Sequence, residues 1–348
     1  MDNTKDLKFP PKGWDRSGLP GWTYHSSALL DLEIEIFKTH WQVACHISDI
    51  PNIGDFKTFD LCGERAIILR DTNFEIKAFH NICRHRGSRL VTNDQGTCKN
   101  ALICPFHGWV YNLDGTLRGA SQPKSFPPLD KNQFSLRPVE YEIWHGFVFV
   151  RFKKGPQPSV KELLNKYERE ASGYKMSEQI PTDGFWTETS PVNWKSIRDV
   201  DNEEYHVAMA HPALQDLYGS NYYDESYKDG ISRSEGKFTA SKGRHWGVRN
   251  YKKFSKPHKD LPKGSNQTWV YYGIFPNSVI AMTQETSLFY QEFPISTDKS
   301  IIRSATYKYP NEDRQQKVAR YLASRIDRET VVEDKQLTIW SNESMVSD

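Results

Sequence analysis

The pattern of hydrophobic and polar positions changes along the chain. From Leu29 to about Trp41, apolar residues recur with helical spacing, and Ser27 is expected to cap this helix at its N-terminus. From Trp41 to about Lys153 the period is two, and Asn, Asp and Gly turns separate short runs that are typical of strands. These runs lie at 41–48, 56–61, 65–70, 76–79, 101–103, 109–111 and 146–152. With a hairpin signal at Asp114-Gly115, they predict a small all-β domain.

A different pattern follows a linker-like break at residues 154–158. It predicts helices at 160–174 and about 194–217, four strands, and a long closing helix from about 312 to 340. The strands are expected at 269–275, 278–284, 287–294 and 301–308. Antiparallel strands followed by a long helix favour an α+β layer in which the helix covers one face of the sheet. The basic, Pro-broken stretch 251–264 predicts a surface loop, with a flap or a docking patch as alternatives.

Composition excludes several classes of protein. The 348 residues include 46 Lys and Arg against 44 Asp and Glu, so the charge gives no reason to expect nucleic acid or an anionic membrane as partner. No apolar run approaches the ~18–20 residues of a membrane span, and the polar start has no apolar signal core. Five cysteines are too few for a disulfide scaffold and fit a reducing compartment, so we expect a cytoplasmic protein whose Cys and His bind metal.

Two Cys-His pairs form the first candidate metal site. Cys83-Arg-His85 is followed, after eighteen residues, by Cys104-Pro-Phe-His107. Chance placement in a core, a structural zinc site and a Rieske [2Fe–2S] cluster all have to be considered. Zinc sites usually pair like with like, whereas here each loop offers one Cys and one His. The mixed arrangement favours a cluster whose two irons take different ligands.

The second candidate site centres on His206 and His211. Five residues on a regular helix turn the two rings about 140° apart, so they converge only if the helix bends or ends, which Pro212 makes plausible. Non-haem Fe(II) sites use two His and one carboxylate, and the candidates for the carboxylate are Glu333 and Asp334 on the closing helix. Only one of these two is expected to face the sheet.

Glu203 stands one turn before His206. Its carboxylate could hydrogen-bond the far nitrogen of that ring and fix the tautomer of the imidazole. The alternative is a solvated acidic helix face.

CRHRG (Cys83–Gly87), CPFHGW (Cys104–Trp109), Asn193-Trp-Lys and Glu203-x-Tyr-His206-x₄-His211-Pro resemble motifs of the Rieske non-haem iron oxygenases, in the large or only oxygenase subunit. The resemblance runs from about Trp41 to Asp334, and a loop insertion near Asp94–Gly96 would explain a slightly long spacer. It implies an α+β chain with three parts. These are an N-terminal arm and helix over 1–40 that packs on the catalytic domain, an all-β Rieske domain over 41–153, and a helix-grip (START/SRPBCC-like) catalytic domain over 154–348.

The resemblance also implies the metal ligands. Cys83 and Cys104 would bind one iron of the cluster and His85 and His107 the other. His206, His211 and Asp334 would bind a mononuclear Fe(II), with Glu333 as the rival of Asp334. Glu203, where aspartate is commoner, would bridge His206 to a cluster histidine of the next subunit in a head-to-tail homotrimer.

By the same resemblance, the protein would be a terminal oxygenase that uses O₂ to hydroxylate or oxidatively demethylate a small organic substrate. The substrate would be a quaternary ammonium compound, a methylated amine or an aromatic acid. The alternatives are a cis-dihydroxylating dioxygenase, a non-enzymatic Rieske electron carrier and a zinc-stabilised binding protein. The sequence has no G-x-G-x-x-G, Walker or four-Cys ferredoxin motif. Electrons from NAD(P)H would therefore come through a separate flavin or iron–sulfur reductase, with or without a ferredoxin.

Overall fold

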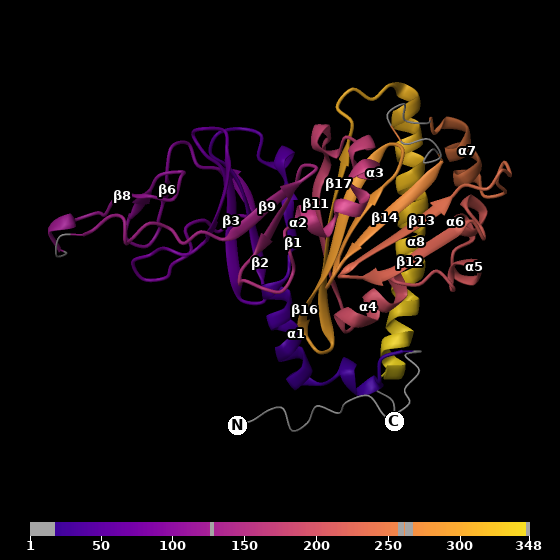
Figure 1. The fold of residues 1–348 in the computed structure, drawn as a ribbon, viewed down its shortest axis with the longest axis horizontal. Coiled ribbons are helices and arrows are strands. Elements are labelled where there is room, and N and C mark those ends of the chain that lie inside the picture. The colour runs from indigo at the N-terminus through magenta and orange to yellow at the C-terminus, as the bar shows by residue number, and fades with distance from the viewer. Residues whose placement is uncertain (1–17, 126–128, 257–260, 262–266, 346–348) are drawn as a thin grey trace. The chain divides into compact units, whose positions relative to one another are not determined.

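The computed structural model describes residues 18–125, 129–256, 261 and 267–345, without the side chains of residues 226–228. The chain forms two compact units: residues 37–162, called here the β unit, and residues 1–36 with 163–348, called the α+β unit (Figure 1). A search of the described helices finds none with the length and apolar character needed to cross a bilayer.

The β unit is built from three small antiparallel sheets. Their strands, in spatial order, are β1 (Gln42–His46), β10 (Phe147–Arg151) and β9 (Glu140–Trp144); β4 (Ile76–His80), β3 (Glu64–Arg70), β2 (Asp55–Leu61) and β5 (Gln95–Thr97); and β6 (Leu102–Ile103), β7 (Val110–Tyr111) and β8 (Leu117–Gly119). Each predicted run contains a strand, so the all-β prediction is confirmed. The predicted hairpin joins β7 to β8, with Gly115 at φ +86°. The expected insertion near Asp94 is not a plain loop, because β5 starts at Gln95 and pairs with β2.

The α+β unit holds one seven-stranded antiparallel sheet. Its spatial order is β11 (Ile180–Ser190), β17 (Lys299–Lys308), β16 (Thr286–Ser296), β15 (Ser278–Met282), β14 (Thr268–Ile274), β13 (Ile231–Lys237) and β12 (Tyr222–Lys228). The helices of the chain are α1 (Ser27–Thr39), α2 (Val160–Leu163), α3 (Glu168–Gly173), α4 (Trp194–Asp201), α5 (Val207–Ala210), α6 (Pro212–Leu217), α7 (Trp246–Phe254) and α8 (Arg314–Met345), with short 3₁₀ turns between several of them.

Helices cover both faces of this sheet. Trp269 on β14 belongs to a buried cluster with Leu322 and Ile326 of α8 and with residues of α6 and α7. Tyr272 on the same strand points to the opposite face, where its hydroxyl donates a hydrogen bond to Glu170 of α3 at 2.7 Å. Figure 1 shows α8, in yellow, running along the sheet. The predicted α+β layer with a long C-terminal helix is therefore confirmed.

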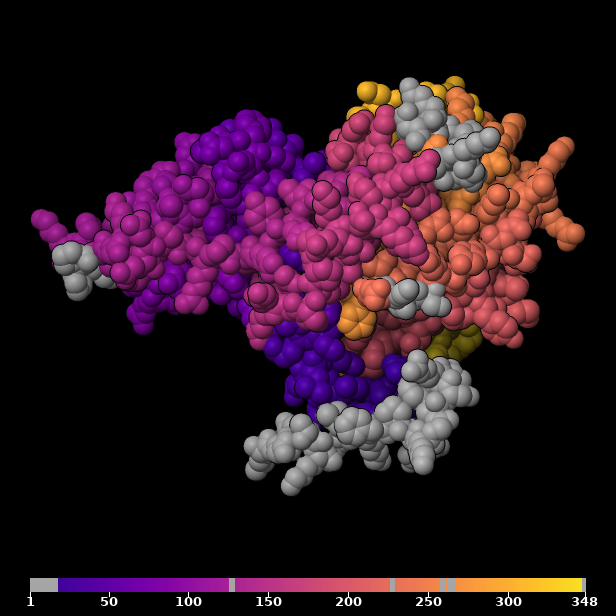
Figure 2. Space-filling view, viewed as in Figure 1, coloured from indigo at the N-terminus to yellow at the C-terminus, as the bar shows by residue number. Residues whose placement is uncertain are grey.

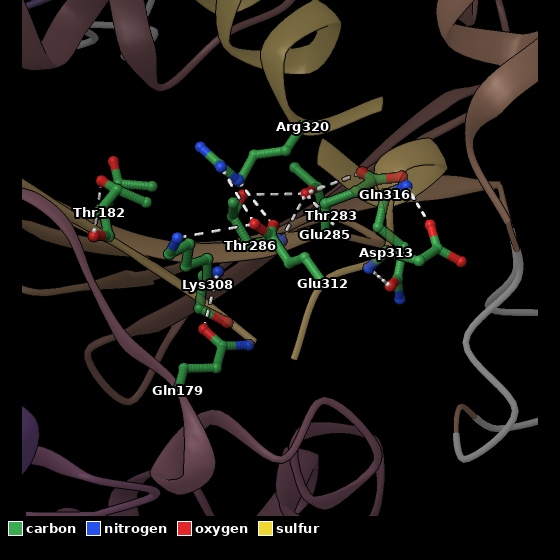
Figure 3. A network of polar contacts seen from close by, with 12 residues as sticks. Gln179, Thr182, Thr283, Glu285, Thr286, Lys308, Glu312, Asp313, Gln316 and Arg320 are labelled. Atoms are coloured by element: carbon green, nitrogen blue, oxygen red, sulfur yellow. Dashed lines mark hydrogen bonds and ion pairs between the residues drawn. The ribbon is translucent and has the colours of Figure 1, made fainter. Parts of the chain in front are cut away.

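The start of α8 is fixed by polar contacts, which Figure 3 shows. Asp313 and Gln316 form a reciprocal cap, in which each side chain accepts a hydrogen bond from the backbone amide of the other at 2.8 Å. The Glu312 side chain, only 2% exposed, accepts two hydrogen bonds from Arg320 at 2.6 and 3.0 Å. These contacts set where the helix begins and how it is turned about its axis.

Several expected elements differ from the structure. The helix expected at 194–217 is three helices, α4, α5 and α6, and the one expected at 160–174 is broken by a 3₁₀ turn at Asn165–Tyr167. Ser26 rather than Ser27 caps α1, because its Oγ accepts the amide hydrogen of Leu29 at 3.2 Å. The stretch expected to be a loop from residue 251 starts inside α7. Its residues 257–260 and 262–264 lie outside the described part of the chain.

Candidate metal centres

Two loops of the β unit carry the first Cys-His motif and fold alike. One starts at Cys83, after β4, and the other at Cys104, after β6. In each loop the amide of the glycine four residues on (Gly87 or Gly108) donates to the cysteine carbonyl at 3.0 Å, and the cysteine amide donates to the carbonyl five residues on, at 2.7 and 2.8 Å. Both glycines have positive φ, 77° and 64°, a backbone conformation that favours glycine. The loops are thus two copies of one turn.

The four side chains of these loops are arranged by type. The thiols of Cys83 and Cys104 are buried and form no disulfide, whereas the rings of His85 and His107 are partly exposed, with their centroids 4.6 Å apart. Burial raises the pKa of the Cys83 thiol, and the adjacent Cys104 raises it further. The Cys83 thiol, buried beside a second cysteine, therefore keeps its proton unless a metal replaces it. The donor set fits a cluster with two Cys on one iron and two His on the other.

Neighbouring aromatic residues support these ligands. The Trp109 ring stacks on His85 at 4.9 Å between centroids and 6° between planes. The Tyr111 hydroxyl lies 3.3 Å from Sγ of Cys83 and accepts a hydrogen bond from the Arg84 amide at 3.0 Å. No sequence pattern indicates a role for Tyr111, because a tyrosine on a short strand is typical of an ordinary core residue.

His206 and His211 converge because the helix is interrupted between them. The amide hydrogen bonds of α5 end at His211, whose backbone (φ −120°, ψ 81°) is extended. Pro212 imposes this, since the residue before a proline is driven out of the helical region, and Pro212 itself starts α6. The Nε2 atoms of the two rings lie 3.0 Å apart. The predicted break at Pro212 is therefore present.

Asp334 of α8 completes this group. Its Oδ1 lies 2.9 Å from Nε2 of His211 and 3.5 Å from Nε2 of His206, and it is buried without accepting a hydrogen bond. One ligand atom from each of the three residues lies within 4.8 Å of the others. Two imidazoles and a carboxylate that converge with their metal-binding atoms are the donor set of non-haem Fe(II) sites. The residues present therefore fit a mononuclear iron.

Glutamates lie behind both imidazoles. Glu203 Oε1 is 2.5 Å from Nδ1 of His206, and Glu333 Oε2 is 2.8 Å from Nδ1 of His211. The carboxylates of Asp334 and Glu203, which face the two nitrogens of the ring, raise the pKa of His206. Burial lowers the pKa of His211, but Asp334 and Glu333 outweigh it, so the net shift is upward. The site thus attracts positive charge, which a metal ion would supply in place of protons.

The Asn193-Trp-Lys motif positions α4, the helix that leads into the metal site. Asn193 caps α4 by accepting the Lys195 amide hydrogen at 2.9 Å, and its Nδ2 donates to the carbonyls of Tyr24 and Thr297 at 2.8 Å each. Trp194 Nε1 and Lys195 Nζ both donate to the buried Glu33 of α1, at 2.8 and 2.7 Å. All three motif residues therefore hold α4 in place.

Further acidic side chains lie near Asp334. Tyr290 donates a hydrogen bond to Asp201 at 2.6 Å, and Asp201 pairs with Arg198 at 2.8 Å. Asp327 lies on the same face of α8 as Asp334, two turns earlier, with its side chain exposed. Surrounding protein nevertheless desolvates this carboxyl and raises its pKa to about 6.

Known proteins share both parts of this chain. Residues 40–134 match the Rieske [2Fe-2S] domain, and residues 170–347 match the ring hydroxylating alpha subunit (catalytic domain). The carnitine monooxygenase oxygenase subunit of Escherichia coli (strain K12) is 29% identical over 208 residues, which cover 60% of this chain and 54% of that protein. The glycine betaine monooxygenase oxygenase subunit of Chromohalobacter salexigens is 32% identical over 243 residues, or 67% and 53% of the two chains.

A solved structure shares the fold. The quaternary ammonium Rieske monooxygenase CntA in complex with L-carnitine superposes with a TM-score of 0.75 at 23% identity, over 94% of this chain and 85% of that one. The chain spans about half the length of the curated relatives it matches. The two family matches imply a Rieske cluster and a mononuclear iron, for which the Cys83/His85/Cys104/His107 and His206/His211/Asp334 groups have fitting donors. Because the catalytic-domain match alone covers just over half of its residues, this chain belongs to the ring-hydroxylating alpha subunits, with a Rieske [2Fe-2S] domain.

Proposed function

We propose that this protein is the terminal oxygenase of a multicomponent monooxygenase that hydroxylates or oxidatively demethylates a small quaternary ammonium compound or methylated amine. The observation that carries the proposal is the convergence of His206, His211 and Asp334 in a chain that also folds two Rieske-type ligand loops. A stand-alone electron carrier has no use for the second group, and a zinc-stabilised binding protein would need only one such group. The relatives named carnitine and glycine betaine monooxygenases support the reaction class.

The protein contributes geometry and proton placement. A ferrous ion held by His206, His211 and Asp334 would supply the activation of O₂. Glu203 and Glu333 keep a proton on Nδ1 of each ring, so that both Nε2 lone pairs face the ligand position. Asp334 supplies the single negative charge among the ligands. The open side of this donor set is where substrate and O₂ would meet.

The charge of the surroundings favours a cationic substrate. Asp327 forms no hydrogen bond or ion pair among the described residues; burial and the charges of Asp334 and Asp201 raise its pKa and outweigh the charge of the adjacent Arg328, which lowers it. Glu204, close to the site in sequence, has its pKa raised to about 7 by burial and by the charges of Asp224 and Glu203. A methylated ammonium group would relieve this repulsion, and the tyrosine rings nearby can add cation–π attraction. An aromatic acid would add to the repulsion.

A single-turnover experiment tests the proposal without the natural reductase. The iron-loaded protein is reduced chemically, freed of excess reductant, and exposed to ¹⁸O₂ with glycine betaine, carnitine or anthranilate; products are analysed by mass spectrometry. We expect an ¹⁸O-labelled or demethylated product from a methylated ammonium compound. A labelled cis-diol from the aromatic acid would favour the dioxygenase alternative, and no product from any substrate class would contradict oxygenase function.

Asp327→Asn tests the charge argument separately. We expect the dissociation constant of the quaternary ammonium substrate to rise about tenfold, as loss of one favourable charge contact of about 1.4 kcal/mol would give. A neutral isostere with carbon in place of nitrogen serves as the matched control and should bind equally to both proteins. Equal weakening for the two ligands would mean that Asp327 acts through structure rather than charge.

A homotrimer and a separate reductase are further parts of the proposal: exposed side chains near His206 support the first, and the relatives named oxygenase subunits support the second. Tyr205 and Met209, which flank His206, are 93% and 90% exposed. The space-filling view shows the segment around α5 and α6, in salmon, at the surface of the α+β unit (Figure 2). The half-exposed Glu203 could there reach a cluster histidine of a neighbouring copy, with Phe106 and Arg86 exposed on the ligand loops of the β unit. Light scattering should give three chains per particle, and Met209→Asp should lower that number.

A further inference from the structure

We infer that Glu333 is a positioning residue for His211, fixing the ring of that ligand from the side opposite the metal. The inference rests on the proposed mononuclear metal site, because it assigns a role toward the metal to a residue that does not bind it. Glu333 and Asp334 are neighbours on α8, yet both touch the same imidazole: Glu333 Oε2 at Nδ1, 2.8 Å, and Asp334 Oδ1 at Nε2, 2.9 Å. They are therefore not rivals for one position.

The helix geometry explains how adjacent residues share one ring. Successive side chains on a helix point about 100° apart. Two adjacent carboxylates can therefore lie on opposite sides of a ring that packs against the helix. The His211 ring occupies that place, since its side chain is 1% exposed and its two nitrogens face the two carboxylates. A ring gripped at both nitrogens can neither flip nor swing away. Its tautomer is also set, because Nδ1 must carry the hydrogen that Glu333 accepts.

The two histidines differ in how they are held. Glu203 reaches His206 from the same turn, and its own side chain is 47% exposed. Glu333 reaches His211 from a helix 122 residues later in the chain, so its hydrogen bond also joins α8 to the α5–α6 corner. Asp334 is the next residue, so one turn of α8 supplies a metal ligand, Asp334, and also the carboxylate that holds a second ligand, His211. Loss of the Glu333 contact should therefore weaken metal binding without removing a donor atom.

Metal affinity measured by competition with a chelator tests the inference on protein that retains its Rieske cluster. We expect Glu333→Ala to weaken Fe(II) and Co(II) binding by about 10–100-fold, the usual effect of losing such a partner. Glu333→Gln keeps an oxygen that can accept the Nδ1 hydrogen, so it should recover most of the affinity. Asp334→Ala, which removes a ligand, should abolish specific binding.

Glu329→Gln is the matched control. Glu329 lies one turn earlier on α8 and pairs with His245 at 3.3 Å and Arg325 at 3.0 Å, away from the metal ligands, so its variant should keep the wild-type affinity. Wild-type affinity in Glu333→Ala would overturn the inference, and so would a loss as complete as that of Asp334→Ala, which would make Glu333 a ligand. A wild-type protein with no specific metal binding would instead contradict the proposed function itself.

Discussion

Glu33 and Trp194, 161 residues apart in the chain, are joined by a hydrogen bond of 2.8 Å from the indole Nε1 to Oε2. The other carboxylate oxygen pairs with Lys195 at 2.7 Å, and both charged side chains are only 8% exposed. The pair fastens α1 to α4, and α4 leads directly into Glu203 and His206. Residues of α1, which are far from His206 in the sequence, therefore help to determine where the metal ligands lie.

Glu33→Ala should destabilise the α+β unit. The substitution leaves the Lys195 ammonium buried without its counter-ion, and breaking a buried pair in this way costs about 3–5 kcal/mol. Thermal and denaturant unfolding should show the loss, together with easier release of the mononuclear metal. Asp31→Ala, at an exposed position of the same helix, is the control and should change stability little. Equal unfolding curves for the two variants would contradict this role of Glu33.

Asp334→Asn should separate the two metal sites. We expect about two irons per chain instead of three, with the Rieske absorption spectrum kept and product formation lost. Glu343→Gln, an exposed position farther along α8, should retain all three irons. Metal analysis and visible spectroscopy on the same samples check both statements. Full mononuclear iron in Asp334→Asn would show that another group supplies the third ligand.

Cys104→Ser should remove the visible spectrum of the cluster. A serine hydroxyl is a poor substitute for a thiolate, and the two ligand loops depend on each other because each supplies one Cys and one His. The measurement is acid-labile sulfide together with the absorption spectrum. Cys62→Ser is the control, since Cys62 lies outside both loops and should leave sulfide content unchanged. A coloured, sulfide-containing Cys104→Ser protein would contradict the assignment.

Glu285 should make stability fall as pH rises. This buried carboxyl accepts hydrogen bonds from Tyr251 at 2.9 Å and Ser255 at 2.6 Å, but burial dominates and raises its pKa to about 7. Between about pH 4.5 and 7 the folded protein keeps a proton that the unfolded chain has released. Raising the pH through this window therefore lowers the free energy of unfolding, by on the order of 3 kcal/mol for this group.

Denaturant unfolding at pH 5 and pH 8 measures this effect. Glu292 and Asp327 also have raised pKa values and act in the same direction. The comparison is therefore between the wild type and Glu285→Gln, in the change of the free energy of unfolding from pH 5 to pH 8. The variant should lose less stability than the wild type between the two pH values. The same change in both proteins would mean that the pKa of Glu285 in the folded protein is near its ordinary value.

Sequence patterns were most informative for residue types that have few structural roles in proteins. Paired Cys and His on turns, and two His before a proline, indicated both metal sites, because those side chains are costly to bury without a partner. In the seven-stranded sheet, strands β11, β12 and β13 were missed because their polar residues, such as Glu225 and Arg233, hide the alternation of a half-buried strand. Arg233 is paired with Glu170 at 2.7 Å, a contact that only the folded chain creates.

The roles of the two carboxylates on α8 could not be read from the sequence for a similar reason. Spacing on a helix shows that the side chains of Glu333 and Asp334 diverge, and it predicts that only one of them faces the sheet. The His211 ring lies between them, and the backbone break at Pro212, in a segment far from α8 in the sequence, brings it there. A contact between residues of separate segments produces no periodic pattern in the sequence of any one segment.

The anchored start of α8 restricts how this part of the chain can change in length. Glu312 and Arg320 fix the helix at one end, and Asp334 must meet the histidines fourteen residues beyond Arg320. A deletion or insertion of a single residue in between would swing the carboxylate by about 100° and shift it about 1.5 Å along the axis. Substitutions are tolerable over much of this stretch, but its residue count is as constrained as the identity of the ligand.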